Sequence, residues 1–338
     1  MVTIPPLVSG YGVVQQRTHP DASSQPGQGA AAPAAPPPAT PADPLLALLD
    51  ATLKSAAVRQ NGLAPLYADL TTLATRPDLP PAMRAAVEAV LMLQLPADEL
   101  GPQALQTAVA RSGLFLEAAL ASGQFGGGDL KAALINLRAV LQSFLGTEPE
   151  ASVRAAPPPP YPGAPPAGQP PSPATAGMLP LKAVAAQVLS DTDAALNRQT
   201  MLQVASLPDA RVPDHPHRLA LEIPLLTPQG TAVVALQVER DGRRAAGEED
   251  KPPVWRIGFS VHLDPAGPIH ARITQTGPHT NVSIVAERVA SAQALHQGLP
   301  LLQAMLAEAA LEPGELNCRL GAPEKGTAAP GRLLDRAT

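Results

Sequence analysis

The sequence predicts an α+β fold class: an N-terminal small helical bundle, a Pro-rich disordered linker, and a C-terminal antiparallel sheet packed with one or two helices. Three observations support this prediction. Apolar residues recur at helical spacing early in the chain, prolines concentrate in two stretches, and apolar and polar residues alternate with strand periodicity later on. With 42 prolines and 26 glycines among 338 residues, one uninterrupted fold is not expected.

Composition excludes several classes of function. The formal net charge is −5 and no long run of like charges appears, so neither nucleic acid nor an anionic membrane surface is an expected partner. No apolar run approaches the roughly 18 residues that span a bilayer, and the N-terminus lacks the features of a cleaved signal peptide. Cys318 is the single cysteine, which excludes an internal disulfide and a zinc–thiolate cluster.

The first segment, residues 1–42, is expected to be a disordered tail. It contains nine prolines and few large apolar side chains, so it cannot bury enough surface to offset the entropy of ordering. Genome base composition would produce the same bias as a selected export or binding tail. A second disordered tail is expected over residues 322–338.

A helical domain is expected over residues 43–150. Asp43 is a typical N-cap and Pro44 suits the first helical position. The leucines that follow share one predicted core-facing side of that helix: Leu45, Leu48, Leu49 and Leu53. Further helical patterns lie over 80–95, 102–123 and 128–145, and brief loops separate them. The whole domain is expected to contain four or five short helices.

One stretch in this domain resembles a phosphate-binding loop, since "GGGDLK" is a glycine run that opens a helix. It follows a helix rather than a strand, and it lacks the Gly-Lys-Ser/Thr ending. Asp129 would also place a carboxylate where the phosphate should sit. Asp129 is therefore predicted to cap the last helix of the domain.

Residues 151–180 contain eleven prolines and are expected to form the Pro-rich linker. Such a composition favours an extended, semi-rigid polyproline conformation, which is typical of a spacer between two domains. The alternative is a recognition site for a polyproline-binding module.

The C-terminal domain is expected over residues 181–321. It begins with one or two helices over 181–208 and closes with a helix over 290–311 and a strand over 314–320. Between them, alternating patterns predict strands over 218–226, 231–240, 255–263, 269–275 and 281–287. Pro300 predicts a kink or a new helical start inside the closing helix.

Three histidines lie in "DPAGPIHARITQTGPHTNVSIVAERV" and the strand before it, and they decide whether this region is a metal site. A turn at "PAG" is expected to place His262 opposite His270, and a turn at "TGPH" to pair Ile273 with Val282 and Ala271 with Ile284. His279 would remain in the second turn. No third ligand joins the pair, so no metal and no other cofactor is expected.

Signals for catalysis are equally weak, and no catalytic residue is assigned. The sequence has no Gly-x-Ser-x-Gly elbow, and Cys318 alternates with Leu316 and Leu320 on an apolar face. The calcium-loop hint in "DTDAALNRQTML" lacks the required glycine and closing glutamate. An enzyme would have to rest on His262, His270 and Glu287.

The pattern over 181–321 resembles the flagellar hook-length control family. Leu263, Pro265 and Gly267 precede alternating apolar residues, and a leucine-spaced helix and a final strand follow. The residues that carry the rest of the resemblance are Ile269, Ala271, Ile273, Val282, Ile284, Leu295, Leu299, Leu302, Leu306, Leu316, Cys318 and Leu320. The sequence departs from the family where its usual leucine before the glycine is missing and where Ala310 replaces a common helix-ending glycine.

The resemblance implies a non-enzymatic, monomeric protein that is cytoplasmic before export and is then secreted through the flagellar type III channel. It implies that the C-terminal domain switches export from hook-type to filament-type substrates. Partners would be an export gate protein, contacted through Leu263, Pro265, Gly267 and Ile269, and the hook and hook-cap proteins. The alternative is a non-flagellar two-domain adaptor or structural interaction protein with a polyproline tether.

Overall fold

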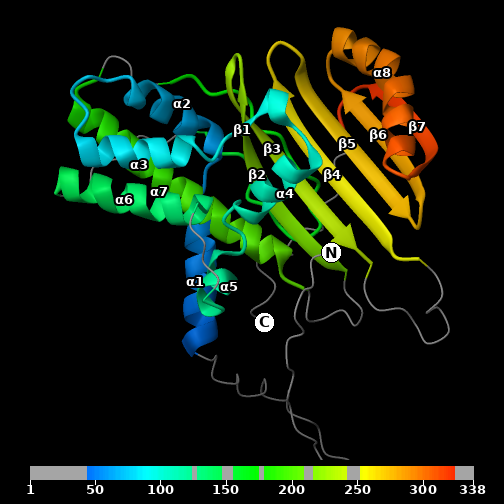
Figure 1. Cartoon of the computed structure of the whole chain (residues 1–338). Coiled ribbons are helices and arrows are strands. Elements are labelled where there is room, and N and C mark those ends of the chain that lie inside the picture. Colours follow the sequence, from blue (N-terminus) through cyan, green and yellow to red (C-terminus); the bar gives the residue numbers. More distant parts are fainter. Residues whose placement is uncertain are drawn as a thin grey trace, which may run out of the picture. The chain divides into compact units, whose positions relative to one another are not determined.

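The computed structural model describes residues 44–123, 128–146, 155–174, 179–208, 216–241 and 252–323 (Figure 1). The predicted tail over 1–42 lies outside the described residues, and so does most of the tail predicted over 322–338. The described residues, which begin at Pro44, belong to one compact unit.

The observed elements match the predicted α+β fold class. The helices are α1 (Pro44–Arg59), α2 (Leu63–Ala74), α3 (Pro81–Leu91), a short 3-10 helix (Ala97–Glu99), α4 (Pro102–Ala110), α5 (Leu116–Ala121), α6 (Leu130–Leu145), α7 (Leu181–Ser206) and α8 (Val289–Glu308). The strands are β1 (Leu95–Pro96), β2 (His217–Thr227), β3 (Gly230–Arg240), β4 (Val254–Leu263), β5 (Gly267–Thr276), β6 (His279–Ala286) and β7 (Glu312–Leu320).

Among the described residues, the strands form one seven-stranded sheet in sequential order from β1 to β7. The sheet was predicted to be antiparallel, but it is mixed: β1 pairs with β2 in parallel, and β7 pairs with β6 in parallel. The parallel pairing of β7 with β6 is explained by α8, which connects these two strands and lies against them (Figure 1). A strand that returns after a crossover helix runs parallel to the strand before the helix.

One core lies among the helices. It joins α2, α3, α6 and α7 through buried leucines and valines, and Val233 of β3 reaches it from the sheet. Leu70, Leu134 and Leu137 at its centre are completely buried. Helix α7 was predicted at the start of the C-terminal domain, yet it packs against α1, α2 and α6. Helices from both sides of the Pro-rich segment therefore share one core.

Helix α1 begins at Pro44, as predicted. Leu53 of its predicted core face is half-buried, but the side chains of Leu48 and Leu49 are mostly exposed, which corrects the prediction that these two leucines face a core. Helix α1 instead packs on α7, and Ala56, near the C-terminal end of α1, is buried. A stripe at helical spacing shows which face can be buried, but another element must be present to cover it.

A second core lies on the apolar face of the sheet. Leu221, Ile223 and Leu225 of β2 pack there with Leu95 and Val261, and side chains of α4 cover them. Helix α4 was predicted to run on through residue 123, but it ends at Ala110 and α5 starts at Leu116. Gly113, with a φ of 93°, lies in the break between them.

Candidate functional site

The turn between β4 and β5 carries the four residues that the sequence suggested for partner binding. Leu263 pairs with Gly267 across this turn, and Asp264, Pro265 and Ala266 form its tip. Leu263 and Ile269 are half-buried and pack against the core on the apolar face of the sheet. Pro265 is the exposed member of the four.

Gly267 is required by the geometry of the turn. Its φ is +79°, in the left-handed region that favours glycine. A Cβ at this position would lie 2.7 Å from Nε of Arg288, so a side chain would also displace that arginine. The glycine in the Leu-x-Pro pattern is therefore explained by backbone conformation and by contact with Arg288.

Two residues at the N-terminus of α8 donate hydrogen bonds to the β4–β5 turn, and the sequence pattern did not identify them. Arg288 Nη1 donates a hydrogen bond to the carbonyl oxygen of Pro265, and Ser291 Oγ donates one to the carbonyl oxygen of Ala266 at 2.6 Å. Beside them, the side chain of Val289 is 57% exposed. The turn and the first turn of α8 thus form one surface, which we call the β4–β5 turn surface: Asp264, Pro265, Ala266, Arg288 and Val289.

The predicted register was right at one turn and wrong at the other. Ile273 pairs with Val282 and Ala271 with Ile284, as expected for the β5–β6 hairpin. His262 was expected opposite His270, but it faces Pro268, and His270 faces Ser260. The turn closes at Leu263 and Gly267 rather than one residue later, because the left-handed Gly267 already belongs to the strand pair.

His270 instead belongs to a polar chain with Ser260 and Glu287. Ser260 Oγ lies 2.8 Å from Nδ1 of His270, and Nε2 of His270 lies 3.3 Å from Oε1 of Glu287. The residue types are those of a hydrolytic triad. However, Ser260 is completely buried and its Oγ accepts the amide hydrogen of Gly168 at 2.8 Å. A substrate carbonyl could not reach this hydroxyl while Gly168 covers it.

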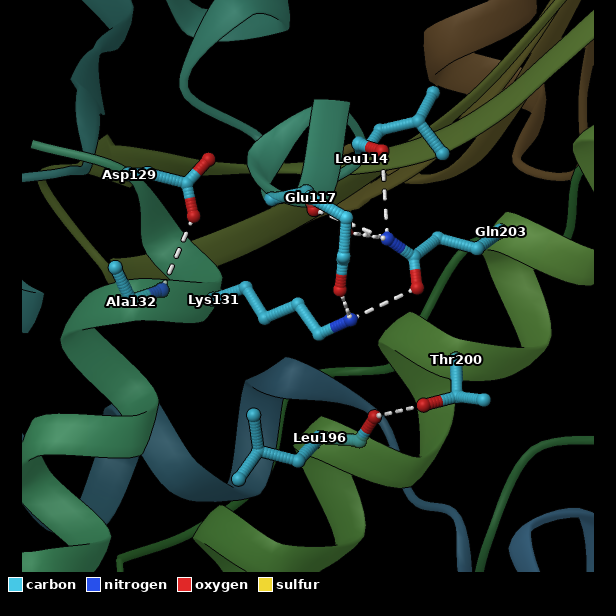
Figure 2. Close-up of polar contacts among 9 residues, drawn as sticks. Leu114, Glu117, Asp129, Lys131, Ala132, Leu196, Thr200 and Gln203 are labelled. Carbon is cyan, nitrogen blue, oxygen red and sulfur yellow. Dashed lines mark hydrogen bonds and ion pairs between the residues drawn. The ribbon is translucent and has the colours of Figure 1, made fainter. Parts of the chain in front are cut away.

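A second polar cluster joins α5, α6 and α7 (Figure 2). Lys131 forms an ion pair with Glu117 and donates to Oε1 of Gln203 at 2.9 Å, and Gln203 Nε2 donates to Oε2 of Glu117 at 2.7 Å. Burial raises the pKa of the Glu117 carboxyl, but the hydrogen bonds from Lys131, the backbone and Gln203 outweigh it and hold that pKa below its usual value. The cluster borders an open pocket of about 460 Å³.

Asp129 caps α6, as predicted from the sequence. Its Oδ1 accepts the amide hydrogen of Ala132 at 3.0 Å (Figure 2). Burial raises the pKa of Asp129, and the hydrogen bonds from backbone amides oppose that shift. Across the described part of the chain, no group of three or more His, Cys, Asp or Glu residues could hold a metal ion. No described helix combines the length and hydropathy needed to cross a membrane.

Comparison with known proteins finds a match in the C-terminal part of the chain. Residues 243–327 match the family model described as flagellar hook-length control protein FliK. The match is shorter than the region 181–321 in which the resemblance was seen, and it covers β4 to β7 and α8 but not α7, β2 or β3. No curated protein and no solved structure matches the chain. The matched family is of a structural and regulatory, non-enzymatic type, and it is the family that the sequence pattern had suggested for the C-terminal part of the chain.

Proposed function

We propose that this chain controls flagellar hook length as an exported protein whose C-terminal domain switches type III export from hook-type to filament-type substrates. The observation that carries the proposal is the match of residues 243–327 to the hook-length control family. These residues include strands β4 to β7 and helix α8, which packs against β6 and β7.

The β4–β5 turn surface is the proposed contact with an export gate protein. Asp264, Pro265 and Val289 are exposed there, whereas Leu263, Gly267 and Ile269 shape the turn from beneath. An exposed proline and valine on a hydrogen-bonded turn offer a rigid apolar contact, which loses little conformational entropy on binding. The roles of Leu263, Gly267 and Ile269 in this proposal are therefore to position Pro265.

Export requires the chain to unfold, and the composition supports this step. The single cysteine permits no internal disulfide, and aromatic residues make up only 2% of the chain. Cores built from alanine, leucine and valine bury less area per side chain than aromatic cores. The free energy of unfolding is expected to stay below about 12 kcal/mol, within the usual range for domains. A larger value from chemical denaturation would argue against export of this chain.

The test is hook length in cells that produce the chain. Deletion of 181–338 is expected to give hooks of uncontrolled length without filaments. A sharper variant is Val289→Asp, which places a charge on the β4–β5 turn surface and is expected to lengthen hooks at normal protein levels. The matched control is Met92→Asp, because Met92 is also an exposed apolar residue, at 83%, but lies at the end of α3.

Two outcomes would count against the proposal. Hooks of normal length that carry filaments in the deletion strain would favour the non-flagellar adaptor. Equal effects of Val289→Asp and Met92→Asp would contradict the assignment of the turn as the contact, while leaving hook-length control itself intact.

A further inference from the structure

Residues 155–174 contain no helix or strand, yet side chains of the folded core hold them at several points. Both ends of the segment contact the junction between α1 and α2. Pro157 accepts a hydrogen bond from Gln60, and Gln169 accepts one from the amide of Ala64. Between these ends the segment reaches β2 and β4, where Gly163 lies near Arg218 and Pro166 near Gly258.

The first anchor consists of buried donors aimed at proline carbonyls. Gln60 Nε2 donates to the oxygen of Pro157 at 2.6 Å, and Arg198 Nη1 lies 3.3 Å from the oxygen of Pro158. Gln60 and Arg198 are only 3% and 4% exposed. A run of prolines has carbonyl acceptors and no amide donors, so a surface that binds it must supply donors. These two side chains do so.

The second anchor lies on β4. Gly258 has no side chain, and a Cβ there would stand 3.3 Å from Cγ of Pro166, so the glycine leaves the space that the proline ring occupies. Ser260 Oγ accepts the amide hydrogen of Gly168 at 2.8 Å. A Cβ on Gly168 would come within 2.8 Å of that oxygen and 3.2 Å of the Val261 backbone, so only glycine can approach this closely.

The third anchor is Gln169, which is 3% exposed and completes the start of α2. The N-cap of α2 is Gly62, which has no side chain to accept the free amides of the first turn. Gln169 Oε1 accepts the Ala64 amide hydrogen at 3.0 Å in its place. A Cβ on Gly62 would lie 2.3 Å from that oxygen, so the glycine at 62 and the glutamine at 169 fit one another.

We propose that these residues form a polyproline-binding groove and that residues 155–174 are its ligand within the same chain. The groove consists of the α1–α2 junction, Arg198, Gly258 and Ser260. The segment has no hydrogen-bond ladder of its own, so its place depends on the three anchors and it can leave without unfolding the helical core. Its departure uncovers Ser260 and the β4 face of the hook-length control domain.

The groove is tested by freeing the segment from the chain. Protease recognition sites are inserted within 147–154 and within 175–178 of the full chain, and the folded protein is cut at both. Because α6 and α7 share one core, the remaining pieces are expected to stay together. The excised segment is expected to co-elute with them in gel filtration. Immediate separation of the wild-type segment from intact remaining pieces would overturn the proposal.

A synthetic peptide of residues 155–174 then measures specificity without any substitution in the groove itself. The labelled peptide is expected to bind the cut protein after its own segment is washed out, and to bind uncut protein at least tenfold more weakly. Peptides with Gly168→Val or Gln169→Ala are expected to lose at least tenfold in affinity. The control peptide carries Ala167→Ser, since Ala167 is exposed. Equal binding of all four peptides would overturn the groove.

Discussion

Arg198 of α7 and Glu222 of β2 form an ion pair that is almost completely buried, with residue exposures of 4% and 1%. Nε and Nη2 of Arg198 both lie 2.7 Å from Oε1 of Glu222, and Nη1 donates to Oε1 of Gln60 at 2.7 Å. The pair therefore ties the helical core to the sheet and also orients the donor that meets Pro158.

Removal of one partner of this pair is expected to be costly. Arg198→Met leaves the Glu222 carboxylate buried without its cation, which should lower the free energy of unfolding by about 3–5 kcal/mol. The double variant Arg198→Met/Glu222→Leu should recover much of that loss, because no charge remains buried. Urea denaturation of Arg198→Met, Glu222→Leu and the double variant measures the coupling free energy between the two side chains.

The control for this cycle is the exposed pair of Asp50 and Lys54 on α1. Lys54→Ala is expected to cost only about 0.3–0.5 kcal/mol, as other solvated pairs four residues apart do. If Arg198→Met cost no more than Lys54→Ala, the ion pair would not be buried in solution.

Ala310 gives a prediction of increased stability. It has a φ of 58°, and among the described residues other than glycine it alone has a positive φ. Leu311 N donates to Leu306 O at 2.9 Å and Ala310 N donates to Ala307 O at 3.0 Å, the pattern of a Schellman motif. Ala310→Gly removes a left-handed strain of about 1–2 kcal/mol and adds unfolded-state entropy.

The expected net effect of Ala310→Gly is a gain of about 0.5–1 kcal/mol in the free energy of unfolding. Thermal denaturation of the full chain measures it as an increase in Tm. A decrease in Tm would mean that α8 does not end in this conformation. Ala309→Gly is the control and should not stabilise, because Ala309 has a φ of −79°.

Much of the sheet could be predicted from sequence because alternation specifies strands strongly. The bounds of β2 to β7 lie close to the predicted ranges, and the β5–β6 register was correct. The error at the β4–β5 turn moved the pairing partner of His270 by two residues and kept the side chains on their predicted faces. The reason is the period of two in a strand, which preserves the face when a register changes by an even number.

Contacts distant in sequence could not be predicted. Gln169 and Ala64 are 105 residues apart, and no periodic pattern connects them. Arg288 and Ser291, which hold the β4–β5 turn, are polar residues at the start of an expected helix, where such residues are common. Two glycines could have indicated such contacts. Gly62 and Gly168 lie outside predicted turns, and both leave space for a part of the chain that is distant in sequence.

Gly267→Ala tests the geometry of the β4–β5 turn. The substitution forces a side chain into the left-handed region and toward Arg288, so it should lower the free energy of unfolding by at least about 1–2 kcal/mol. Gly298→Ala in α8 is the matched control, since its Cβ would meet no neighbour, and it should stabilise by up to about 1 kcal/mol. Chemical denaturation compares the two, and a neutral Gly267→Ala would exclude the observed turn.

The cluster of Glu117, Lys131 and Gln203 predicts a specific pH dependence (Figure 2). The pKa of Glu117 is lower in the folded state than its usual value, so its contribution to stability is present above the unfolded-state pKa of about 4.3. That contribution is lost as the pH falls through the folded-state pKa, because the unfolded chain binds the proton first.

Glu117→Gln removes this titration. Because the Glu117 side chain is 58% exposed, solvent weakens the pair, and the variant should be less stable at pH 7 by only about 0.2–1 kcal/mol. As the pH falls through the folded-state pKa of Glu117, the wild-type carboxyl also becomes protonated, and the two proteins should converge in stability. Urea denaturation over a pH series from pH 7 downward measures the difference, and a gap that widens toward low pH would show that Glu117 titrates with the opposite sign.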